Sequence, residues 1–178
     1  MAYQVYTPGT RPHILINWQS FVDQGIDPSW QGPFSDAVIN AYTRWMTIAG
    51  VDLRFQFWGY TDQTAANPGE LIIQMDPQFG GGPEARLAST FTGSNNGTII
   101  MHRRNAVDGS PWNFVPYNAQ PGEFDMQAIV MHESGHAHGL DHSSNPNDTM
   151  YGFQLLRITE FAFWKTFLTA GVVTLAGL

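Results

Sequence analysis

The clearest pattern along the chain is a run of apolar side chains at helical spacing. They recur every three to four residues, so they would form one face of an amphipathic helix. We expect this helix to end near Gly50 and to begin at Ser35 or Asp36, whose side chains can accept hydrogen bonds from first-turn N–H groups. The apolar positions are Phe34, Ala37, Val38, Ala41, Tyr42, Trp45 and Met46.

Five shorter segments predict strands, because they are apolar or alternate apolar with polar residues and are bounded by Gly, Pro, Asn or Asp. The turn signal Asn95-Asn96-Gly97 between the last two predicts a hairpin. The segments are His13–Trp18, Val51–Trp58, Leu71–Met75, Arg86–Phe91 and Thr98–Met101.

The second half of the chain predicts loops and helices. An irregular region covers roughly residues 103–122, and a second helix runs from about Glu123 to Ala137. A loop follows from Gly139 to Gln154, and a last helix is expected from near Thr159. The order strand, helix, four strands, helix, helix predicts one α+β domain over residues 1–178, with a mixed sheet and helices on one face.

Composition excludes several classes of function. The chain has no cysteine, so disulfides, thiolate metal sites and cysteine nucleophiles are excluded. Its net charge is -7, from 8 basic and 15 acidic residues. Such a surface repels nucleic acid and anionic membranes, so neither is an expected partner.

The ends of the chain bear on its location. The first residues, MAYQVYTPGTRPH, lack the basic start and apolar run of a secretory signal. No transmembrane segment is expected, since the apolar tail at residues 161–178 is interrupted by Lys165 and falls short of the ~20 residues needed to span a bilayer. The surface is poor in lysine, which favours an extracellular or secreted setting.

The segment HESGHAHGLDH, residues 132–142, carries the candidate chemistry. His132 and His136 are four apart on the second predicted helix, so both imidazoles lie on one face and can grip one metal ion. Glu133 is adjacent, and its carboxylate can reach a water beside that metal without being a ligand. Gly139 can end the helix sharply, which would bring His142 to the same ion. Three imidazoles with one open position are typical of a catalytic zinc.

The other histidines have plainer interpretations. His13 is expected at a strand end, and His102 beside a loop. His138 is two residues from His136, so it points to another face and is expected beside the ligands or on the surface.

The pattern H-E-x-x-H-x-x-G-x-x-H resembles the metzincin signature. Met150 lies eight residues after His142, where these peptidases have a methionine turn, and Ser143 follows the third histidine. The serine, this spacing and the pair Met150-Tyr151 resemble the matrixin branch, the matrix metalloproteinases. Tyr151 directly follows the methionine and is therefore not expected to be a ligand.

The resemblance implies a fold and a set of roles. The fold would be a mixed, mostly parallel five-stranded sheet with an antiparallel edge strand, two long helices and a C-terminal helix. Met150 would pack beneath the three histidines. The segment containing Leu87, Ala88 and Ser89 would be the edge strand on which a protein or peptide substrate pairs.

The chain also departs from the matrixin pattern. Ser89 and Ile100 stand where histidines of the family's second, structural zinc would be, so that zinc is not expected. Asp76 and the glycines of residues 80–82 could frame a Ca²⁺ ion. A cysteine-based latency segment is impossible in a chain without cysteine.

These observations predict a zinc-dependent endopeptidase with Glu133 as general base. Two alternatives stay open. One is a structural or assembly protein, a component of a shell, filament or virion, that self-associates through the tail at residues 161–178. The other is a zinc hydrolase acting on a non-peptide amide.

Overall fold

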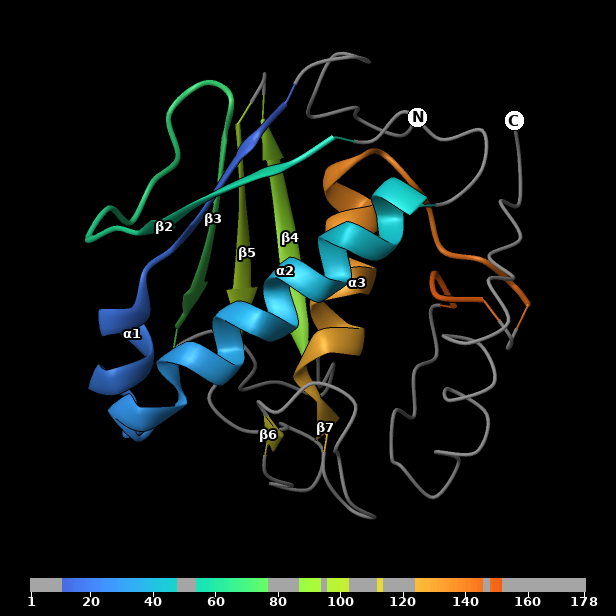
Figure 1. Ribbon diagram of the computed structural model, residues 1–178. Helices are drawn as coiled ribbons and strands as arrows, with labels where there is room; N and C mark the ends of the chain where they lie inside the picture. Colours follow the sequence, from blue (N-terminus) through green and yellow to red (C-terminus); the bar gives the residue numbers. More distant parts are fainter. Residues whose placement is uncertain are drawn as a thin grey trace.

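The computed structural model describes residues 11–47, 54–76, 87–93, 96–102, 112–113, 124–145 and 148–151 (Figure 1). The last expected helix, the tail at residues 161–178 and the glycine loop at residues 80–82 lie outside these ranges. No helix within the described part of the chain combines the length and the apolar character needed to cross a bilayer.

The described elements confirm an α+β fold. In chain order they are β1 (His13–Ile16), α1 (Trp18–Asp23), the 3-10 helix η1 (Pro28–Trp30), α2 (Gln31–Thr47), β2 (Gln56–Tyr60), β3 (Glu70–Met75), β4 (Ala88–Gly93), β5 (Asn96–Met101), β6 (Trp112–Asn113), β7 (Phe124–Asp125) and α3 (Met126–Ala137).

Five strands form one mixed sheet in the order β2-β1-β3-β5-β4. The pairs β1–β2, β1–β3 and β3–β5 are parallel, and β4 pairs with β5 antiparallel. The expected mostly parallel sheet with an antiparallel edge strand is therefore confirmed. A separate pair, β6 and β7, directly precedes α3.

The core lies between this sheet and the helices. Alternate residues of the central strands, such as Ile14 and Ile16 of β1 and Leu71 and Ile73 of β3, pack in one cluster with apolar residues of α2 and α3. Figure 1 shows α2 crossing in front of the strands with α3 beside it. Each fully buried aliphatic side chain of this kind stabilises the fold by about 1.5–3 kcal/mol.

One side chain ties the two long helices together. The indole N–H of Trp45 in α2 lies 2.8 Å from the carbonyl oxygen of Met131 and 2.9 Å from Oγ of Ser134, both in α3. Because Trp45 is fully buried, these bonds satisfy the one polar atom of a large apolar side chain. They also fix the position of α3 against α2.

Two expectations about the first helices were wrong. A short helix, α1, follows β1, where a loop was expected; the side chain of Asn17 caps it by accepting from the N–H of Ser20. Helix α2 begins at Gln31, directly after η1, and not after a cap at Ser35 or Asp36. Pro33 is accepted there because the first N–H groups of a helix have no intrahelical partner.

The second strand was expected at Val51–Trp58, but β2 covers Gln56–Tyr60. Its ladder with β1 starts where Gln56 donates to the carbonyl of Pro12, and proline has no N–H with which to continue it. The register shifts between Ile14 and Leu15, so Trp58 has no partner in the ladder. Its ring stacks on His13, with centroids 3.4 Å apart.

Two smaller differences concern element ends. Asn96 and Gly97 were expected in the turn Asn95-Asn96-Gly97, but both belong to β5. Helix α3 begins at Met126 and not near Glu123, because Phe124 and Asp125 pair with β6 first.

Candidate metal centre

The candidate metal centre is built on α3. Asp125 caps this helix, its carboxylate accepting hydrogen bonds from two backbone N–H groups of the first turn. Burial raises the pKa of Asp125 to about 6, although both hydrogen bonds act in the opposite direction. Farther along the helix, His132 and His136 are one turn apart, so both imidazoles project from the same side.

Gly139 ends α3 with a φ of 81°, a left-handed conformation that favours glycine. The N–H of Gly139 donates to the carbonyl of His136 at 2.9 Å, and the N–H of Leu140 donates to that of Gly135 at 3.0 Å. This pair of bonds is a Schellman motif, which closes the helix and turns the chain away from its axis. The turn brings His142 back toward the helix.

Three imidazoles converge at this point. Nε2 of His136 lies 3.1 Å from Nε2 of His132 and 3.1 Å from Nε2 of His142. The three residues form a group able to hold a metal ion, the ligand atoms all lying within 4.8 Å of one another. Nitrogens bound tetrahedrally at about 2.0–2.1 Å from zinc would be about 3.3 Å apart. The observed spacing therefore fits a single ion among them.

The other ring nitrogens are held by the backbone. Nδ1 of His132 lies 2.8 Å from the carbonyl oxygen of Thr149, and Nδ1 of His136 lies 2.8 Å from that of Leu140. A carbonyl only accepts, so both Nδ1 atoms carry a hydrogen, and each neutral ring then presents a lone pair at Nε2. Lone pairs directed at one another repel, and a cation between them removes that repulsion.

Burial keeps the imidazoles of His132 and His136 neutral. In the metal-free protein, burial lowers the pKa of His132 to about 3, although the hydrogen bond to Thr149 acts the other way. Burial also lowers the pKa of His136. Both rings are therefore neutral at pH 7, the form that binds a metal. Because an unfolded histidine has the higher pKa, the metal-free fold loses stability as pH falls below about 6.5.

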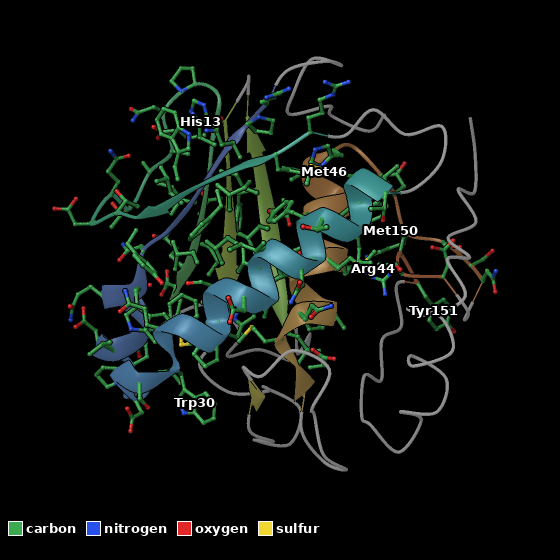
Figure 2. All side chains as sticks on the ribbon, viewed as in Figure 1. His13, Trp30, Arg44, Met46, Met150 and Tyr151 are labelled. Atoms are coloured by element: carbon green, nitrogen blue, oxygen red, sulfur yellow. The ribbon has the colours of Figure 1, made fainter. Side chains whose placement is uncertain are left out.

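Met150 packs against the helix that carries the ligands. Its side chain is 4% exposed and belongs to the core cluster. A Cβ atom at Gly135, which lies between the two ligands of α3, would overlap Sδ of Met150 and come within 3.1 Å of Cζ2 of Trp45. Figure 2 shows Met150 beside the C-terminal part of α2, where Arg44 and Met46 are labelled.

The segment of residues 148–151 is joined to the chain beside the third histidine. The N–H of Ser143 donates to the carbonyl of Met150 at 2.7 Å, and Ser143 and Tyr151 form a parallel bridge. The N–H of Met150 in turn donates to Oδ1 of Asp148. These bonds couple the position of His142 to that of Met150.

Comparison with known proteins agrees with this geometry. The family model described as Matrixin matches residues 31–161, which is more than half of the chain. The chain belongs to the matrixin family. In a comparison with curated proteins, no sequence matches it. The match begins with α2 and includes the three histidines, Glu133 and Met150.

Glu133 lies in α3 beside the first histidine of this matrixin centre, and its side chain is 7% exposed. The hydroxyl Oγ1 of Thr90, in β4, lies 2.5 Å from Oε2 of Glu133 and 2.9 Å from its backbone oxygen. The edge strand is thus joined to α3 at this glutamate. Leu87, half-buried, precedes β4, and Ala88 within it is buried against the core.

The positions at which this chain departs from the matrixin pattern are neighbours in the sheet. Ser89 of β4 pairs with Ile100 of β5. Their hydroxyl and aliphatic side chains supply no imidazole for a second zinc. Asp76 follows β3, and its N–H donates to the carbonyl of Met101. The glycine loop that would complete a calcium site with Asp76 lies outside the described residues, so that expectation stays a prediction.

Residues that the sequence interpretation missed support the centre from a distance. Thr90 reaches Glu133 from the edge strand, while Gly135 leaves room for Met150 and Trp45 by having no side chain. The signal for Gly135 was its place between two ligands, where a small residue lets another segment approach. His138 is not part of the group of three: its Nδ1 lies 2.7 Å from the carbonyl of Ser134, and its ring packs edge-on against Phe55.

Proposed function

We propose that this matrixin-family chain is a zinc-dependent endopeptidase. The observation that carries the proposal is the convergence of the Nε2 atoms of His132, His136 and His142. Three imidazoles are the ligand set of a catalytic zinc site with one position open for water or substrate. A zinc ion held there would polarise the peptide carbonyl and lower the pKa of a water to about 7.

Glu133 is the general base of the proposed reaction. It takes a proton from the attacking water and delivers it to the nitrogen of the leaving amine, so that one carboxylate serves both halves of the reaction. Its position in the helix, next to His132, supports this role. The hydroxyl of Thr90 in β4 contacts its carboxyl oxygen Oε2.

Met150 is proposed to act as the methionine turn, packing beneath the ligands without reacting. Its contact with Gly135 supports this role, as does the hydrogen bond between its carbonyl and Ser143. A peptide substrate is proposed to lie extended along the segment from Leu87 to Ser89, at the start of β4. The place of β4 at the edge of the sheet supports this, because an edge strand can pair with an added one.

The test is cleavage of a mixed peptide library by the purified chain, with and without a zinc chelator. Cleavage should require zinc, stop with the chelator and return when zinc is restored. Glu133→Gln should bind zinc like the wild type and lose activity by about 10²–10⁴-fold. His13→Gln, a histidine substitution outside the centre, should change neither property. Full activity in Glu133→Gln would show that another group is the base.

The same library experiment addresses the alternatives. A hydrolase of non-peptide amides would leave every peptide intact and cleave small amides in a zinc-dependent way. A structural or assembly protein would cleave neither.

Self-association through the tail at residues 161–178 stays a prediction, which size exclusion of the full chain against a chain shortened at about Gly171 would test. An extracellular site of action, based on the lysine-poor surface, also stays a proposal.

A further inference from the structure

Thr90 and Glu133 are 43 residues apart in the sequence and come from different elements. Ala88 of β4 faces the core beneath the helices. Thr90 lies two residues farther along the same strand, so its side chain points to the same face. The hydroxyl meets Glu133 at two atoms, Oε2 at 2.5 Å and the backbone oxygen at 2.9 Å.

We propose that Thr90 is a positioning residue for Glu133, holding its carboxyl group in one orientation through the two contacts of its hydroxyl. The inference rests on the hydrolytic function proposed above. Thr90 is not among the three residues that could hold a metal ion. It acts through the glutamate.

A threonine hydroxyl is suited to this task by its chemistry. It offers one hydrogen and two lone pairs, and its hydrogen can rotate about the C–O bond. When the carboxyl group is ionised, the hydroxyl donates to Oε2, and 2.5 Å is within the range for a hydroxyl and a charged oxygen. The oxygen stays in place because branching at Cβ restricts the side chain of threonine.

The second contact lies on the main chain of the same residue. Oγ1 is 2.9 Å from the backbone oxygen of Glu133, so one hydroxyl is placed against both the carboxyl group and the backbone of α3. The position of the carboxyl group is thereby set by β4 as well as by the helix that carries it.

A purely structural role would be different. A hydrogen bond from Thr90 to the backbone of Glu133 would be enough to join β4 to α3. Removing it would lower stability without a specific effect on turnover. Catalysis is sensitive to placement, since a displacement of about 1 Å can cost on the order of 10²-fold in rate. The two roles are thus separable by kinetics.

The test compares Thr90→Val, which keeps the shape and lacks the hydroxyl, with Thr90→Ser, which keeps the hydroxyl. Both are made in the full chain loaded with zinc and assayed on a peptide cleaved by the wild type. Thr90→Val should lower kcat by about 10–100-fold, with KM changed by less than about threefold. Thr90→Ser should retain kcat within about threefold. The matched control is Thr98→Val in β5, which should leave kcat unchanged.

The outcomes separate this inference from the proposed function. If the wild type cleaves no peptide, or Glu133→Gln is fully active, the proposed function fails. If Glu133→Gln is inactive and Thr90→Val turns over like the wild type, only the positioning role fails. A loss of melting temperature or zinc content in Thr90→Val that accounts for its lost activity would also overturn it. Thr90→Ala, which removes the same hydroxyl with less bulk, must lose kcat as well, and it decides the matter if the valine variant does not fold.

Discussion

Gly135 and Met150 lie so close together that α3 has no room for a side chain at position 135. A Cβ there would overlap the sulfur of Met150 and crowd Trp45. Gly135→Ala therefore gains about 1 kcal/mol of helix propensity but forces a repacking that costs about 1–3 kcal/mol. We expect a net loss of about 1 kcal/mol in the free energy of unfolding, measured with denaturant, and weaker zinc binding.

Gly32 offers the matched control, because a Cβ at this position in α2 meets nothing within 4 Å. Gly32→Ala should be neutral or stabilise the fold by up to about 1 kcal/mol. In a Met150→Ala background the substitution at 135 should cost less than in the wild type, since the overlapping sulfur is gone. Equal costs in both backgrounds would contradict the proposed contact.

His142 is exposed, unlike His132 on α3. His142→Asn should therefore leave the metal-free stability within about 0.5 kcal/mol of the wild type, as for other surface substitutions. Zinc should raise the melting temperature of the wild type through preferential binding to the folded state, by about 4 kcal/mol at a thousandfold excess over Kd. The variant should lose most of that gain. Thermal unfolding with and without zinc tests this; an undiminished gain would exclude His142 as a ligand.

Asp125 gives the stability of the fold a defined pH dependence. Its pKa is raised to about 6, so the folded state favours the protonated acid. This contribution is fully present below about pH 4 and is lost as pH rises through about 6. Asp125→Asn keeps a capping oxygen without the charge. Its stability relative to the wild type should rise by on the order of 3 kcal/mol between those limits.

Denaturant unfolding of both proteins across this pH range measures the difference directly. Using the difference removes the titration of every group that the two proteins share. Parallel stability curves, with no divergence between about pH 4 and pH 7, would show that Asp125 ionises in the fold as it does in water.

Much of the fold follows from local patterns. The helical spacing from Phe34 to Met46 placed α2, and short apolar runs placed β3 and β5 to within two residues. Alternation cannot reveal where a ladder stops, and that is why β2 was misplaced: its start depends on Pro12, the residue just before β1. The pattern did not predict helix α1, because its cap, Asn17, directly follows a buried strand.

Local sequence patterns likewise predict one part of the candidate site and not the other. The three histidines and Gly139 are within eleven residues, so helix geometry alone indicates their convergence. Thr90 is 43 residues from Glu133. Nothing in the spacing of either segment indicates that β4 and α3 meet there, because that contact depends on how the sheet pairs and how the helix packs on it.

The two hydrogen bonds that orient His132 and His136 end on peptide oxygens, at Thr149 and Leu140. Every amino acid brings such an oxygen, so exchanging either side chain leaves the acceptor in place. The orientation of both rings thus depends on the path of the main chain and not on the side chains at these two positions. Substitutions at these two positions can therefore change the side chains around the centre while the two hydrogen bonds persist. An insertion or deletion between 137 and 149 would move the backbone oxygens and disturb the geometry of the centre far more than a substitution.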